Sequence, residues 1–127
     1  MHKMILVGLG GFIGAVLRYL ISGCIQNLTQ SVAFPYGTLA VNITGCFLIG
    51  ILSHLVESQA GITVEMRLLL IIGLLGSFTT YSTFSNETMN LLQDQRLLLA
   101  LLNIATHTIL GLSAVLLGRF TIITIWR

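Results

Sequence analysis

Charged side chains are the scarcest class of residue in this sequence. Of its 127 residues only 8% are charged, with six Lys or Arg and four Asp or Glu, whereas 55% are hydrophobic. A water-soluble domain carries about 25% charged residues. The composition therefore excludes a soluble globular protein and indicates an integral membrane protein.

The chain also lacks the residue sets on which enzymes depend. It contains no Ser, His and Asp set, no cluster of metal ligands and no phosphate-binding loop. Its two cysteines, Cys24 and Cys46, have no metal-ligand spacing and are expected to remain free thiols. We therefore predict that the protein is not an enzyme, and we expect no nucleic-acid partner.

Four apolar segments account for nearly the whole chain, and each has at least the roughly 20 residues that a membrane-spanning helix needs. They lie at residues 4–24, 36–56, 67–92 and 97–121. The only proline, Pro35, precedes the second segment, a position that suits a helix start. The sequence predicts one all-α transmembrane domain, residues 1–127, with four helices and short connections.

Basic residues are only weakly biased between the two sides of the membrane. The side that holds both termini carries Lys3, Arg67, Arg119 and Arg127, and the other side clearly carries Arg96. This bias favours cytoplasmic termini, but so few charges leave insertion in both orientations open.

Acidic residues are missing from the middle of every predicted span, whereas hydrogen-bond donors are present there. A proton-coupled cation exporter needs a buried carboxylate that trades protons for its substrate. The spans carry instead Arg18, Asn42, Tyr81 and several hydroxyls, a set of donors that favours an anion. Glu87, near the end of the third span, is expected to pair with an arginine at the membrane interface.

The third span is interrupted by a polar stretch, Gly-Ser-Phe-Thr-Thr-Tyr-Ser-Thr-Phe-Ser, at residues 76–85. An unsatisfied polar group at membrane depth costs several kcal/mol, so this stretch must face protein or a wet path. Gly76 to Thr80 fit an unbroken helix least well, and we predict a helix break there. Carbonyls at such a break coordinate small cations such as sodium, whereas half-helix N-termini favour anions.

The polar groups of the first two spans each have two interpretations. The glycines at 8, 10, 11 and 14 indicate close helix packing. Arg18 either snorkels to the interface or attracts anions from a vestibule. Asn42 either links helices through hydrogen bonds or donates to a desolvated anion.

The same choice applies to the last two spans. Tyr81 and Phe84 are three residues apart and so share a helix face, where they either pack or present positive ring edges to an anion. Asn103 and His107 share a face of the fourth span. His107 is either a proton relay or gate, or a structural histidine that is hydrogen-bonded to a neighbour.

These motifs resemble the Fluc (CrcB) family of fluoride channels over essentially the whole chain. The resemblance is carried by Gly-Gly-Phe-Ile-Gly-Ala-Val-Leu-Arg-Tyr at 10–19, Gly-Thr-Leu-Ala-Val-Asn-Ile-Thr-Gly at 37–45 and, most specifically, the stretch at 76–85. It implies an antiparallel, dual-topology homodimer in the bacterial inner membrane, with two pores through which fluoride leaves the cell passively.

The resemblance also implies roles for single residues. Asn42 would line the pore, Tyr81 and Phe84 would occupy the positions of the family's phenylalanine pair, and Arg18 would lie in the vestibule. A polar track would include Ser82 and Thr83, with His107 and Asn103 at matching positions of the fourth span. A structural sodium ion at the dimer centre would be held by the backbone carbonyls of Gly76 and Thr79.

One departure from the family pattern is Tyr81, which stands where the family typically has phenylalanine. Its hydroxyl adds a donor to the pore or narrows it. Two other functions remain open: a small multidrug-resistance type transporter, which would need a carboxylate in the middle of the first span, and a membrane scaffold subunit that transports nothing.

Overall fold

The computed structural model describes residues 1–58 and 61–125, and within these residues it contains helices and loops but no strand. Its helices are α1 (His2–Thr29), α2 (Tyr36–Glu57), α3 (Val64–Met66), η1 (Arg67–Leu75), α4 (Gly76–Phe78), α5 (Tyr81–Gln93) and α6 (Leu97–Ile125). The elements from Val64 to Gln93 form one interrupted span, so four spans are long and apolar enough to cross a membrane. The predicted all-α fold with four spans is confirmed. Arg127, which the sequence analysis assigned to the side of the termini, lies outside the described residues.

The loop between α1 and α2 is closed by one glutamine. The carboxamide nitrogen of Gln26 donates to the carbonyls of Ser31 and Phe34, and its oxygen accepts from the amide of Gly37, 3.0 Å away. Pro35 then precedes Tyr36, the first residue of α2, as the sequence predicted. The side chain of Gln26 therefore holds the end of α1 against the start of α2.

The predicted break in the third span is confirmed, and it is confined to two residues. Thr79 (ψ 154°) and Thr80 (φ −148°) have extended backbones, whereas Gly76–Phe78 is still helical. The hydroxyl of Thr80 accepts from the amide of Thr83 at 3.3 Å and so caps α5. The break thus ends one helix and starts another in the middle of the membrane.

The segment before the break, η1, is a π-helix. At its end the amide of Gly76 reaches back to the carbonyl of Ile71, one residue further than in an α-helix. The hydropathy pattern did not predict this, because an α-helix and a π-helix bury the same kinds of residue. Wide turns of this type are rare and frequently lie at functional sites.

Glycines allow the closest helix contacts. α1 packs along η1, and α2 packs along α6. A Cβ atom on Gly10 would lie 2.1 Å from the carbonyl oxygen of Leu69, and one on Gly118 would lie 2.2 Å from that of Phe47. The prediction of close packing is correct for Gly10 but wrong for Gly8, where a Cβ would meet nothing within 4 Å.

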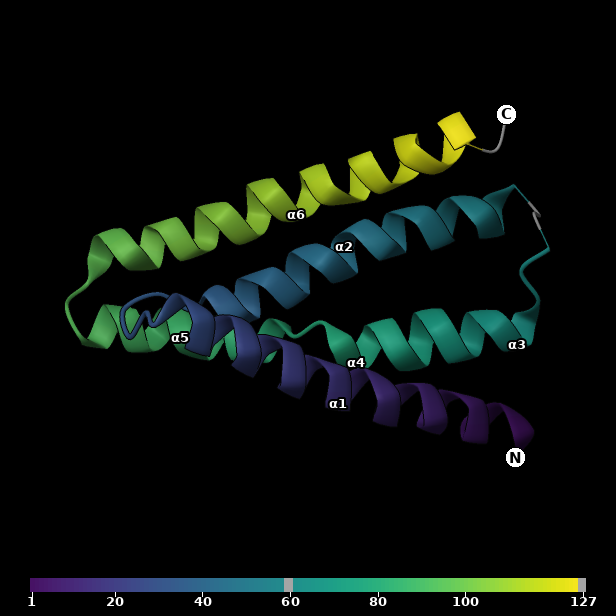
Figure 1. Ribbon diagram of the computed structural model, residues 1–127, viewed down its shortest axis with the longest axis horizontal. Helices are drawn as coiled ribbons and strands as arrows, with labels where there is room; N and C mark the ends of the chain where they lie inside the picture. The colour runs from purple at the N-terminus through teal and green to yellow at the C-terminus, as the bar shows by residue number, and fades with distance from the viewer. Residues whose placement is uncertain (59–60, 126–127) are drawn as a thin grey trace.

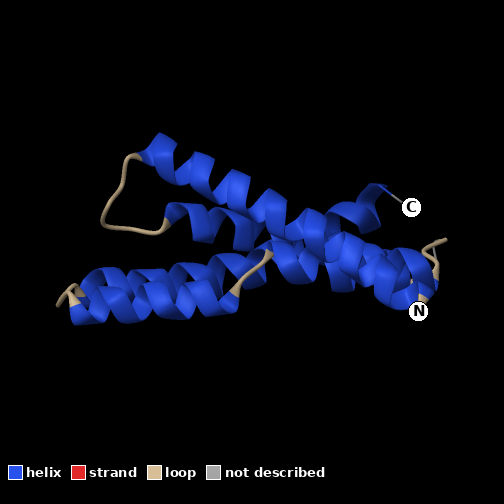
Figure 2. Cartoon of the chain, turned by 90° about the horizontal axis from the view of Figure 1, so that it is seen from below, coloured by secondary structure: helices blue, strands red, loops and turns tan. Residues whose placement is uncertain are grey.

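The loops divide between the two ends of the molecule. The N-terminus, the end of α2 and the end of α6 lie at one end, and the α1–α2 loop and α5–α6 turn lie at the other (Figure 1). Toward this second end the hairpins α1–α2 and α5–α6 diverge (Figure 2). At the first end Arg119 and Glu57 form an ion pair with an N–O distance of 2.6 Å.

Candidate functional site

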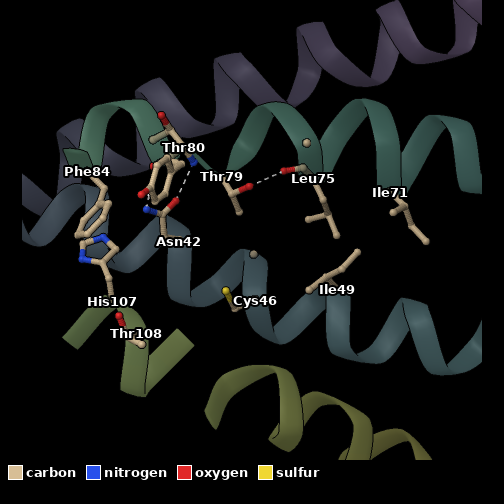
Figure 3. A pocket seen from close by; sticks show the side chains of 13 residues that line it. Asn42, Cys46, Ile49, Ile71, Leu75, Thr79, Thr80, Phe84, His107 and Thr108 are labelled. Atoms are coloured by element: carbon tan, nitrogen blue, oxygen red, sulfur yellow. Dashed lines mark hydrogen bonds between the residues drawn. The ribbon is translucent and has the colours of Figure 1, made fainter. Parts of the chain in front are cut away.

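The break in the third span opens onto a cavity of about 440 Å³. The cavity lies between α2, the segment around the break, α5 and α6 (Figure 3). Its polar lining includes Asn42, Thr79, Thr80, Tyr81 and His107. Four of the predicted pore residues therefore border one cavity: Asn42 from α2, Tyr81 and Phe84 from α5, and His107 from α6.

Asn42 is bonded to the break itself. Its side-chain oxygen accepts from the amide of Thr80 at 2.8 Å, and its side-chain nitrogen donates to the carbonyl of Thr80 at 3.1 Å (Figure 3). The carboxamide thus supplies the acceptor that the amide of Thr80 loses at the break. Because an amide nitrogen carries two hydrogens, the second one is left for another acceptor. Asn42 links two helices and lines the cavity as well.

The break also affects the backbone carbonyl of Gly76. In an unbroken α-helix this carbonyl would accept from the amide of Thr80, but that amide is bonded to Asn42. Gly76 is exposed, and Thr79 follows it in extended conformation. Carbonyls of an unwound segment are suitable ligands for a sodium ion, so Gly76 and Thr79 fit the predicted cation site.

Three rings lie side by side at the cavity. The ring centroids of Tyr81 and Phe84 are 5.6 Å apart, and those of Phe84 and His107 are 4.5 Å apart. Tyr81 is 80% exposed, so its hydroxyl lies on the outer face of this single chain. The predicted aromatic pair from α5 is extended by an imidazole from α6.

A second cavity, of about 320 Å³, also borders the break at Thr80. Arg18, Thr38 and Thr83 contribute to its lining. Thr80 borders both cavities, whereas Asn42, which is bonded to Thr80, borders only the first, and we call this bonded pair the partition. Arg18 and Thr83 therefore occupy a polar recess at the partition, whereas Ser82 is exposed and borders neither cavity.

Glu87 does not pair with an arginine, contrary to the sequence-based expectation. Its carboxylate accepts from the hydroxyl of Thr38 at 2.6 Å. Among the described residues the only ion pair is that of Arg119 with Glu57. This half-buried carboxylate is closer to the neutral hydroxyl of Thr38 on α2 than to any cation in the described part of the chain.

Asn103 lies behind the ring of His107 rather than in the cavity. It is completely buried, and its side-chain nitrogen donates to the hydroxyl of Thr88 at 3.0 Å. Its main-chain carbonyl accepts from Nδ1 of His107 at 3.0 Å. The shared face that the sequence predicted for Asn103 and His107 is real, but only His107 borders the cavity.

Three threonines of the site were not singled out from the sequence: Thr38, Thr80 and Thr88. Thr80 had one usable signal, because it precedes the helix of Tyr81 and a threonine there suits an N-cap. The contacts of Thr38 with Glu87 and of Thr88 with Asn103 join distant helices, and no local pattern predicts them.

Four spanning helices, with a third span that is broken where two cavities meet it, define a multi-pass helical membrane protein. The chain belongs to the CrcB family, since the model described as "CrcB-like protein, Camphor Resistance (CrcB)" matches residues 5–119.

The relatives of the chain cover nearly its whole length. It is 48% identical over 121 residues to "Fluoride-specific ion channel FluC 1" of Methanosarcina acetivorans, which is 95% of this chain and 91% of the relative. It is 47% identical to "Fluoride-specific ion channel FluC" of Shewanella baltica, over 94% of both chains. It is 39% identical to the protein of that name from Maridesulfovibrio salexigens, over 93% of both chains.

Proposed function

We propose that this protein is a fluoride-selective channel through which fluoride crosses the membrane passively, and that it is not an enzyme. The family membership and the names of the relatives support this proposal. The observation that carries it is the partition formed by the bonded pair Asn42 and Thr80, which lies between two cavities that border the helix break.

Fluoride is small and strongly hydrated, so a selective pore must replace its water with close donors. Two donors remain at the partition: the second amide hydrogen of Asn42, and the hydroxyl hydrogen of Thr83, whose oxygen accepts from Thr80 at 3.0 Å. The positive edges of Tyr81 and Phe84 continue this path on the other side. Conduction requires each of these contacts to be weak enough for the ion to be released onward.

Arg18 would act before the partition. It borders the recess that also contains Thr83, so its positive charge would raise the local concentration of anions there. The recess would therefore serve as the anion vestibule of the proposed channel.

The assembly of the channel is also part of the proposal. An antiparallel homodimer with two pores in the bacterial inner membrane would cover surfaces that a single chain leaves open. The exposed hydroxyl of Tyr81 at membrane depth supports this, because such a group needs a partner other than lipid. The backbone carbonyls of Gly76 and Thr79 from both copies would hold a sodium ion at the centre of the dimer. The positive charge of the ion would attract the carbonyls at both helix breaks and so hold the two copies together.

The proposal is tested by fluoride efflux from liposomes that contain the purified protein. Asn42→Ala leaves the buried amide of Thr80 without its partner, at a cost of about 1–3 kcal/mol, and we expect efflux to fall at least about tenfold. Asn86→Ala is the matched control, because Asn86 is exposed on α5 and borders neither cavity.

The same assay distinguishes the other functions. Liposomes that retain fluoride when the unmodified protein is present would indicate a scaffold. A drug transporter would not respond selectively to fluoride, and the first span has no central carboxylate for that activity. Equal efflux of chloride and fluoride would contradict the proposed selectivity.

A further inference from the structure

Phe84 and His107 form the part of the cavity wall where α5 meets α6. Their centroids are 4.5 Å apart with an angle of 42° between the ring planes, and the two rings face each other in Figure 3. One ring comes from each helix, so their contact depends on how α5 and α6 are held together.

The hydrogen bond of His107 determines which of its nitrogens carries the proton. Nδ1 lies 3.0 Å from the main-chain carbonyl oxygen of Asn103, which only accepts, so Nδ1 must donate. In a neutral imidazole Nε2 then has no hydrogen and only accepts. Nε2 is buried and has no hydrogen-bond partner in residues 1–58 and 61–125. The neutral ring therefore has no N–H left for an anion.

Asn103 is connected to both members of this pair. Its main-chain carbonyl holds His107, and its side-chain nitrogen donates to the hydroxyl of Thr88 at 3.0 Å. That hydroxyl donates in turn to the main-chain carbonyl of Phe84 at 2.8 Å. The completely buried carboxamide thus ties α6 to the turn of α5 that carries Phe84.

We propose that Asn103, acting through Thr88, is a positioning residue for the stacked pair Phe84–His107, and that His107 serves as a third ring of the pore wall rather than as an N–H donor. This inference rests on the proposed channel function. It explains why Asn103 is polar although it borders neither cavity, and it gives His107 the same role as its two aromatic neighbours.

Flux and selectivity test the positioning role. Asn103→Leu and Thr88→Val each remove the link between α5 and α6, and we expect fluoride efflux to fall about threefold to tenfold, with a lower fluoride-to-chloride permeability ratio. Thr121→Val is the matched control: its hydroxyl also donates to a carbonyl of its own helix at 2.8 Å, but it receives no bond from another helix. If the variants only reduced the amount of folded protein, flux would fall but the fluoride-to-chloride permeability ratio would stay unchanged. That result would overturn the positioning role.

Two substitutions of His107 separate the ring from the N–H group. His107→Phe retains a ring without a donor, and His107→Gln retains a donor without a ring. We expect His107→Gln to lose about tenfold more flux than His107→Phe, because removing a well-packed ring costs more stabilisation than removing a single hydrogen bond in the membrane. The reverse order would overturn the proposed role of the imidazole.

Nitrogen NMR of a variant in which His107 is the only histidine gives a readout that does not depend on transport. We expect the proton on Nδ1, and a proton on Nε2 in the neutral ring would overturn the inference. If the unmodified protein passes no fluoride, the proposed function fails. The NMR signal would then still report the proton position on His107. A double-mutant cycle of Asn103→Leu and Thr88→Val, measured as free energies of unfolding, would still show whether Asn103 and Thr88 are coupled.

Discussion

Asn42 and Thr80 are the residues on which the helix break depends. Breaking a helix in a membrane leaves backbone groups without partners, and lipid offers none. The carboxamide of Asn42 supplies both a donor and an acceptor to Thr80, and the hydroxyl of Thr80 caps the helix that follows. The same two residues separate the cavities, so the stability of the break and the proposed pathway have a common origin.

Tyr81 offers a test at this scale. Its hydroxyl extends the ring at the position where the family typically has phenylalanine, and we predict that Tyr81→Phe supports fluoride efflux at least as fast as the unmodified chain. Efflux from liposomes measures this. Slower efflux would show that the hydroxyl donates to the ion instead of obstructing it.

At the scale of the helices, α1 and the π-helical η1 pack closely against each other. The backbone of η1 reaches α1 where α1 has no side chain, at Gly10 and Gly14. This contact holds the segment just before the break, so the geometry of the break depends on small residues of another helix.

Gly10→Ala is therefore predicted to destabilise the protein by about 1–3 kcal/mol, as overpacking does. A methyl group there would lie 2.1 Å from a backbone oxygen that cannot turn away. Gly8→Ala is the control on the same helix, because nothing lies within 4 Å of its Cβ position. The measurement is the free energy of unfolding in detergent, and equal values for the two variants would contradict the prediction.

At the scale of the whole molecule, few charges determine which end of the protein faces the cytoplasm. The two ends of the bundle differ by only a few basic residues, which gives the positive-inside effect little to act on. An antiparallel dimer requires both orientations in the same membrane, and this charge pattern is compatible with that requirement.

Orientation can be measured by labelling. In a variant with Cys24→Ser and Cys46→Ser, a cysteine at Gln93 or at Glu65 reports on opposite ends of the molecule, and both residues are exposed. We predict that an impermeant maleimide labels about half of each variant in sealed vesicles, as expected when the positive-inside bias is weak. Full labelling of one variant and none of the other would rule out dual topology.

Much of the fold could be predicted because it follows from local properties. Span positions depend on the transfer of each side chain into lipid, and the break follows from a run of residues that disfavour a membrane helix. The π-helix, and the fact that nothing lies within 4 Å of the Cβ position of Gly8, could not be predicted. Both depend on how one helix lies against another.

For the site, the sequence singled out Asn42, Tyr81 and Phe84, which do border one cavity. It did not indicate the partner of Glu87, since Thr38 is 49 positions away and a hydroxyl competes with arginines for the carboxylate. It also grouped Asn103 with His107 as pore residues, whereas Asn103 is buried behind the wall. Spacing on one helix shows which residues share a face, but not what that face meets.

The sequence by itself determined that this protein lies in a membrane, crosses it four times and interrupts its third crossing. Those properties depend on the hydropathy and backbone preferences of short segments. Only the tertiary structure decided that Asn42 closes the break, that Thr80 divides two cavities and that His107 stacks on Phe84. Each of these contacts joins helices that are far apart in the chain, and its energy depends on distances that only packing sets.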